Sequence, residues 1–260
     1  LYTAGGRRDD AIAQLQILAG LERDRPERQI ALAEAYARSA QPDLAVLTLS
    51  RMLGRGPSQP AVYEALGSVW LDLAESRQDR VALAKAVEAL ARAAEGASAT
   101  SAALTLYGRS LLASGQPEAA ARALQRATER YPVWPAAWLY FANASERLGR
   151  WEVARRALVH YGDIAVEEAD AAARAARIAG LALRSNEWAE AAVWYRKAMA
   201  AAPADAQLAV SLAEVQIRTG DQDGATETVR AALTRAPGQP ALSALARRLG
   251  LTAPAAASGR

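Results

Sequence analysis

The chain has no cysteine, a single histidine and a single phenylalanine among its 260 residues. Without cysteine it can form no disulfide, carry no thiolate nucleophile and offer no sulfur ligand to a metal. A Ser–His–Asp arrangement could be built only around His160, and nothing in the sequence near that residue indicates one. A lone histidine is typical of a surface position. We therefore expect no catalytic residue, no metal and no bound cofactor.

Long apolar runs and concentrated charge are also missing. No stretch of about 18 apolar residues occurs, so we expect no membrane-spanning helix. The 31 basic and 28 acidic side chains give a net charge of +3, and they are interspersed along the chain. A nucleic-acid binder has a concentrated basic stripe instead, so we expect no nucleic acid among the partners.

A short turn sequence recurs along the chain. Copies begin at Gly6, Ala40, Gly115, Gly149, Asn186 and Gly220, and each has an alanine five residues later. The steps between successive copies are 34, 75, 34, 37 and 34 residues. Such a period indicates a stacked repeat protein rather than a globular catalytic domain.

The segment 101–134 shows the repeat most clearly. With Ser101 as position 1, positions 4, 7, 8, 11, 20, 24, 27 and 32 hold Leu104, Tyr107, Gly108, Leu111, Ala120, Leu124, Ala127 and Pro132. This pattern resembles the tetratricopeptide repeat, which has large residues at positions 4 and 24, glycine at 8, alanine at 20 and proline at 32. The resemblance covers about residues 2–239. It implies an all-α fold, a right-handed α-solenoid of stacked antiparallel helix pairs with a C-terminal capping helix.

The same register divides the whole chain. We predict a single solenoid over residues 1–249, made of a partial repeat (1–25), six repeats (26–59, 60–100, 101–134, 135–171, 172–205 and 206–239) and a capping helix (240–249). Tyr2 falls at position 11 of the partial repeat, so we expect the chain to begin inside a helix and to belong to something longer. We predict a disordered tail over residues 250–260, because the residues from Thr252 onward are small and carry no charge before Arg260.

One repeat contains an insertion. Repeat 60–100 is 41 residues long because its second helix resumes seven residues late, after the segment 75–80. This predicts either a lengthened turn or extended helix ends inside one hairpin, and the sequence does not decide whether the arm bends there.

Small residues explain how each pair closes. Apolar side chains at positions 4, 7, 8 and 11 form a stripe on the first helix, and those at 20, 24 and 27 form one on the second. Small residues at positions 8 and 20 allow the two helices to approach closely, since a larger side chain would overpack the crossing. Each hairpin still leaves apolar surface exposed and must stack on its neighbours.

The resemblance also implies where a partner binds. In tetratricopeptide repeats, positions 2, 5, 9, 12 and 13 of the first helix line a concave groove. The candidates are Arg109, Leu139, Asn143, Arg147, Leu183, Arg184, Val210, Glu214, Ile217 and Arg218. Three of these arginines share position 13 in successive repeats and could pair with acidic groups of a ligand. Alternatively, they end their helices, where a cation interacts favourably with the helix dipole.

Aromatic residues are concentrated in the segment 131–151. Trp138 and Phe141 fall at core positions, and Trp151 falls at position 17, where an aromatic commonly packs against the second helix. Trp134 and Tyr140 have no such assignment. They are candidate anchors for a partner, although an ordinary contact between repeats also explains them.

These observations predict a non-catalytic scaffold that holds a peptide, a helix or a protein in its groove. Abundant alanine and arginine are typical of bacteria with GC-rich genomes, which favours a bacterial multiprotein assembly, and the lack of cysteine slightly favours the periplasm or envelope over the cytoplasm. Two alternatives stay open. The chain could be the repeat arm of a longer enzyme, such as a glycosyltransferase, or a module that forms homo-oligomers through its end repeats.

Overall fold

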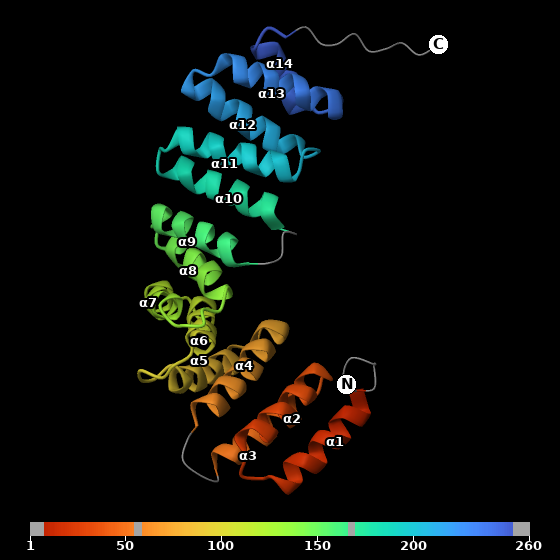
Figure 1. The fold of residues 1–260 in the computed structure, drawn as a ribbon, viewed down its shortest axis with the longest axis vertical. Coiled ribbons are helices and arrows are strands. Elements are labelled where there is room, and N and C mark those ends of the chain that lie inside the picture. Colours follow the sequence, from red (N-terminus) through yellow and green to blue (C-terminus); the bar gives the residue numbers. More distant parts are fainter. Residues whose placement is uncertain (1–7, 55–58, 166–169, 252–260) are drawn as a thin grey trace, which may run out of the picture. The chain divides into compact units, whose positions relative to one another are not determined.

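The computed structural model describes residues 8–54, 59–165 and 170–251. These ranges hold fourteen α-helices and no strand (Figure 1). The helices are α1 (Arg8–Leu21), α2 (Pro26–Arg38), α3 (Pro42–Leu53), α4 (Pro60–Arg77), α5 (Arg80–Ala93), α6 (Ser101–Ala113), α7 (Pro117–Thr128), α8 (Ala136–Arg147), α9 (Trp151–Ile164), α10 (Ala171–Arg184), α11 (Trp188–Ala201), α12 (Ala206–Thr219), α13 (Gln222–Arg235) and α14 (Pro240–Arg248). The ends of the chain, where Tyr2 and most of the expected tail fall, lie outside the described residues.

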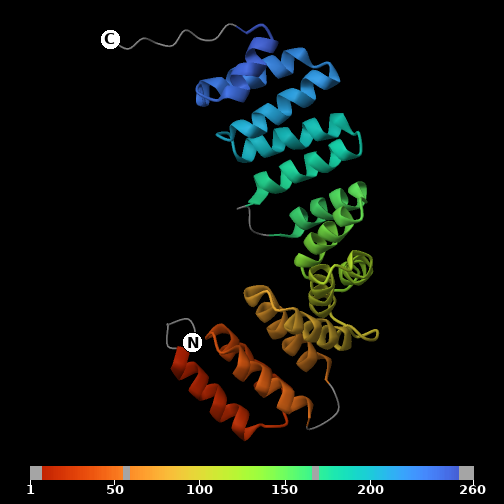
Figure 2. The same cartoon turned by 180° about the vertical axis from the view of Figure 1, so that it is seen from behind.

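The helices form two compact units, Leu1–Leu148 and Gly149–Arg260. Within each unit every helix packs on the next one along the chain, and alternate helices also touch, as α2 does α4 and α12 does α14. Figure 2 shows the same side-by-side pairing from behind. The predicted fold class, stacked helix pairs followed by a capping helix, is confirmed. The unit boundary separates α8 from α9, both assigned to repeat 135–171, so the undivided solenoid over 1–249 stays a prediction.

The recurring turn ends the first helix of each pair in the same way. The residue at position 15 has a positive φ in Ala40, Gly115, Gly149, Asn186 and Gly220, with values from 58° to 84°. In four of these turns, all but that of Gly149, the next residue donates its N–H to the carbonyl at position 11, as Gln116 does to Leu111 at 2.9 Å. This is the Schellman arrangement, which satisfies a carbonyl at the helix end. Glycine and asparagine suit the left-handed conformation that it requires, which is why they recur there.

The insertion in repeat 60–100 lengthens the helices and leaves the turn short. α4 ends at Arg77, five residues beyond the usual end of a first helix, and α5 begins at Arg80, three residues before its expected start. The connection, Gln78 and Asp79, is one residue shorter than the three residues between α2 and α3, so the net insertion is seven residues. Gln78 takes the left-handed conformation and Asp79 caps α5 by accepting from the N–H groups of Val81 and Ala82. The insertion therefore extends the helix ends, as one of the two interpretations predicted, and the alternative of a lengthened turn is wrong.

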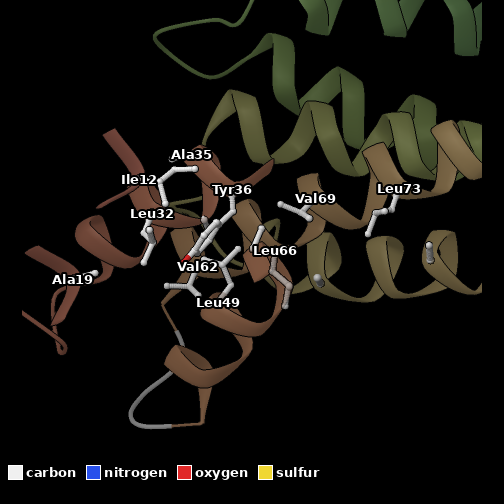
Figure 3. Packing of buried hydrophobic residues seen from close by; sticks show 14 of the residues in the cluster. Ile12, Ala19, Leu32, Ala35, Tyr36, Leu49, Val62, Leu66, Val69 and Leu73 are labelled. Atoms are coloured by element: carbon white, nitrogen blue, oxygen red, sulfur yellow. The ribbon is translucent and has the colours of Figure 1, made fainter. Parts of the chain in front are cut away.

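The small residues lie where the helices of a pair come closest. Every alanine at positions 8 and 20 of the six full repeats is fully buried. A Cβ added to Gly108 would lie 2.3 Å from Leu124 Cγ, and one added to Gly67 would lie 2.4 Å from Leu90 Cγ. Apolar side chains of α1–α5 form a buried cluster in the first unit, with Leu49 and Val62 among its members (Figure 3). In α14, Leu242 and Leu245 are buried while Arg247 and Arg248 are exposed, as expected of a capping helix.

Gly108→Ala should destabilise the protein, because the new methyl group collides with the branch point of Leu124. We expect the free energy of unfolding to fall by about 1–3 kcal/mol. The control is Gly180→Ala in the interior of α10, where no atom lies within 4 Å of the added Cβ. That change should stabilise by up to about 1 kcal/mol through helix propensity. Urea denaturation followed by circular dichroism measures both, and equal effects would contradict the close approach at position 8.

Candidate partner-binding surface

The position-13 arginines lie at the ends of their helices. Arg147 and Arg184 are the last residues of α8 and α10, Arg218 is the penultimate residue of α12, and all three are exposed. Arg147 Nη1 donates to the carbonyl of Leu112, near the end of α6, at 2.6 Å. A cation at this place meets the negative end of a helix dipole. The contact with α6 supports the interpretation of Arg147 as a helix-end residue.

Arg184 and Arg218 share a different arrangement. The guanidinium of Arg184 stacks 4.6 Å from the ring centroid of Trp151, and that of Arg218 lies 4.5 Å from the ring of Trp188. Both tryptophans are the first residues of second helices, α9 and α11. Such cation–π contacts contribute about 0.5–1 kcal/mol at exposed sites. A tryptophan at position 17 followed by an arginine at position 13 of the next repeat is the sequence signal for this stack.

Arg109 forms an ion pair with a neighbouring first helix, α4. Its Nε donates to Glu75 Oε1 at 2.9 Å, and its Nη2 contacts both Glu75 Oε2 and, at 3.9 Å, Asp72. The ring of Tyr140 lies 5.9 Å away. The side chain of Arg109 is only 25% exposed, so these contacts join α6 to α4 and α8. Arg109 is thus a structural link more than a cation offered to a ligand.

The exposed face of α4 is acidic and partly desolvated. Burial raises the pKa of Asp72, which the guanidinium of Arg109 lowers in part while Glu75 adds to the increase. Burial also raises the pKa of Glu64, although Thr100 Oγ1 donates a hydrogen bond to Glu64 Oε2 at 3.2 Å and partly offsets it. Partial loss of hydration destabilises the charged form of both carboxylates, which is the usual effect of burial on a charged group.

The remaining groove candidates differ in exposure. Leu139, Leu183 and Ile217 are partly buried, and Glu214 is exposed. Asn143 is partly buried and already engaged by another group of the protein. Val210 is only 7% exposed and belongs to the core cluster of α12, α13 and α14, so it offers almost no surface to a partner.

The candidates fall into two sets, one in each unit. Arg109, Leu139, Asn143 and Arg147 belong to the first unit, and the residues from Leu183 to Arg218 belong to the second. The two sets are therefore two candidate groove surfaces, one in each unit. Their assignment to a groove comes from the resemblance and stays a prediction.

The two candidate aromatic anchors differ in their surroundings. Trp134 is 40% exposed, and its backbone N–H donates to Ser101 Oγ at 2.9 Å. Tyr140 is partly buried against the core of α6 and α7. Tyr131, which has no assignment from the repeat pattern, is 98% exposed. It lines an open cavity of about 650 Å³ between the segments 97–102 and 129–135, together with Trp134.

The part of the chain that the structure describes holds neither a metal site nor a membrane-spanning helix. No group of three or more histidine, aspartate or glutamate side chains is placed to hold a metal ion. No helix there combines the length and the apolar character needed to cross a bilayer.

Two segments match family models described as tetratricopeptide repeat, residues 101–144 and residues 182–249. The chain is a tetratricopeptide repeat protein. The first segment includes the copy from which the register was read, and the second includes both Trp188 and Arg218. No curated protein matches the sequence.

Solved structures of other repeat proteins share the fold. Cut9, from the APC/C hetero-tetramer Cut9–Hcn1, is 14% identical with a TM-score of 0.54; the match covers 94% of this chain but only 46% of that one. YrrB, described as a repeat protein with an unusual peptide-binding site, is 16% identical with a TM-score of 0.59 over 75% of this chain and 94% of its own. PilF of Pseudomonas aeruginosa is 18% identical with a TM-score of 0.55 over 93% and 99%. At these identities the likeness shows the fold alone.

Glu64→Gln should raise the stability of this repeat protein at neutral pH. Folding raises the pKa of Glu64 above its ordinary value. The ionised side chain therefore lowers the free energy of unfolding, and this destabilisation is largest at pH values above the raised pKa. The cost disappears as the pH falls below the ordinary value near 4.5, where the side chain is neutral in both states. Glutamine keeps an oxygen to accept from Thr100.

Thermal unfolding at pH 7 and pH 4 tests this prediction. The gain in melting temperature should be present at pH 7 and absent at pH 4. Glu88→Gln, at an exposed position of α5, is the matched control and should change the melting temperature little at either pH. A Glu64→Gln protein less stable than the unmodified one at pH 7 would show that the carboxylate is stabilising there.

Proposed function

We propose that this protein is a non-catalytic scaffold whose first-helix surfaces hold a peptide segment, with acidic groups, of a partner protein. The observation that carries the proposal is the pair of arginines stacked on tryptophan in the second unit. Stacking engages the face of a guanidinium and leaves its N–H edges available. Among the described residues neither Arg184 nor Arg218 forms an ion pair, and both are exposed. They are therefore ordered cations suited to carboxylates.

Apolar side chains lie beside these cations. Leu183 and Ile217 immediately precede Arg184 and Arg218, and both are partly buried. A surface of this kind suits an amphipathic segment, whose apolar side chains lose water while its acidic ones pair with arginine. The ordering of the arginines before binding reduces the entropy lost on association.

We further propose a place in a bacterial multiprotein assembly. The abundance of alanine and arginine supports a bacterial origin. The structural likeness to YrrB and to PilF, one described by its peptide-binding site and the other bacterial, is consistent with this proposal.

Reversing Arg147, Arg184 and Arg218 to glutamate should weaken partner binding at least tenfold while the helical content stays unchanged. A tenfold loss corresponds to about 1.4 kcal/mol. The matched control reverses Arg122, Arg196 and Arg230, which are exposed on the second helices α7, α11 and α13. This control changes the net charge by the same amount but leaves the side chains of the first helices unchanged.

Partners are captured by cross-linking to the unmodified protein and to both triple variants in parallel, and mass spectrometry identifies the captured proteins. Calorimetry then measures the affinity of the purified partner for each of the three proteins. Circular dichroism verifies the fold of each variant. If both triple variants bind the partner as tightly as the unmodified protein, the arginines serve only to end their helices and the proposal is wrong. The same conclusion follows if no protein is captured in preference to a blank resin.

A further inference from the structure

A pocket of about 510 Å³ lies in the first unit where α4 passes the turn between α2 and α3. Its walls include Ala40, Pro42, Val69, Asp72, Leu73 and Arg77. The volume is within the range of small-ligand sites, about 300–1,000 Å³. None of the ten groove candidates lines it, although Ala37, Arg38 and Asp72 hold the groove positions 12 and 13 of their repeats.

In the second unit, the protein fills the corresponding position with its own side chains. Pro42 is at position 17 of its repeat, the place of Trp151 and Trp188, and Asp72 is at position 13 of the next repeat, the place of Arg184 and Arg218. Ala40 corresponds to Gly149, whose added Cβ would lie 3.7 Å from the ring of Trp151. In the first unit, therefore, proline and aspartate leave unfilled a space that elsewhere takes an indole ring beside the same turn.

The insertion in repeat 60–100 supplies a further wall. Ser76 and Arg77 belong to the five residues by which α4 exceeds the usual first helix, and both line the pocket. The floor is apolar. Val69 and Leu73 follow Leu66 along α4 and belong to the buried cluster of Figure 3. The pocket thus depends on two separate sequence features, a missing tryptophan and an added helical turn.

The charges around the pocket indicate what would lie beside an aromatic ring. Arg38 already pairs with Glu34 at 3.5 Å, and Asp72 lies 3.9 Å from Arg109. Arg77 is exposed at the end of α4 and has no ion pair or hydrogen bond from its side chain to any described residue. A carboxylate is the natural partner of such a guanidinium.

We propose that this pocket binds an aromatic side chain of a partner peptide, while an acidic side chain next to it in the peptide pairs with Arg77. The inference rests on the proposed function, because it assigns a partner residue to a specific place on the scaffold. It concerns an acidic residue inside a peptide, not the carboxylate at a peptide's end.

Short peptides with blocked ends test the pocket without a known partner. The probe is acetyl-Glu-Trp-Glu-amide, and the comparison peptides are acetyl-Glu-Ala-Glu-amide, acetyl-Lys-Trp-Lys-amide and acetyl-tryptophan with a free carboxylate. Binding is followed by NMR of the methyl groups of Val69 and Leu73. We expect the Glu-Trp-Glu peptide to bind at least tenfold more tightly than the other three. Equal binding of the alanine peptide would overturn the aromatic assignment, and tighter binding of acetyl-tryptophan would assign the site to a peptide terminus.

Pro42→Trp should fill the pocket from within and weaken binding of the probe at least tenfold. Pro117→Trp is the matched control, because it makes the same change at position 17 of the repeat 101–134, outside the pocket, and should leave binding unchanged. Arg77→Glu provides a second variant that does not fill the pocket, and it should reverse the preference so that the Lys-Trp-Lys peptide binds better. Probe binding that is unaffected by both Pro42→Trp and Arg77→Glu would overturn the proposal.

The captured partner separates this inference from the proposed function. If the arginine triple variant weakens partner binding but Pro42→Trp and Arg77→Glu do not, the scaffold proposal stands and the pocket assignment is wrong. If none of these variants changes partner affinity, the scaffold proposal is wrong as well.

Discussion

The structure depends on the close approach of two helices within each pair. Alanine or glycine at positions 8 and 20 brings the helices so near that Leu124 and Leu90 occupy the space a side chain on Gly108 or Gly67 would need. Once this crossing is set, the leftover apolar stripes face the next pair, and stacking follows from the need to bury them. The surfaces on which we propose partner binding are the faces that neither packing step covers.

Much of the fold could be predicted because its determinants are local and repeat along the chain. Gly115, Gly149, Asn186 and Gly220 mark the ends of first helices, and the φ values found there are those the turn requires. The alanines of positions 8 and 20 mark the crossings, and those of the six full repeats are fully buried. The choice between a longer turn and longer helices at residues 75–80 could not be made, because Gln78 is an unusual residue for the left-handed conformation that ends α4.

The candidate surface was harder to predict because it depends on contacts between repeats. The resemblance placed Arg184 and Arg218 at one repeat position, but their tryptophan partners belong to the preceding repeat and are brought near only by stacking. Val210 has the register of a groove residue, yet α14 joins α12 and α13 in a core that includes it. Tyr131 lies in a connection between helices, where the repeat pattern makes no statement about exposure.

The extra length of α4 has a consequence for alignment. At about 1.5 Å per residue, five added residues carry the end of this helix about 7.5 Å beyond the usual stopping point of a first helix. A ligand that lies across near-identical repeats could shift by one repeat and lose few contacts. If a ligand lies across the repeats as proposed above, the projecting end of α4 makes one repeat unlike the others and would disfavour a placement shifted by one repeat.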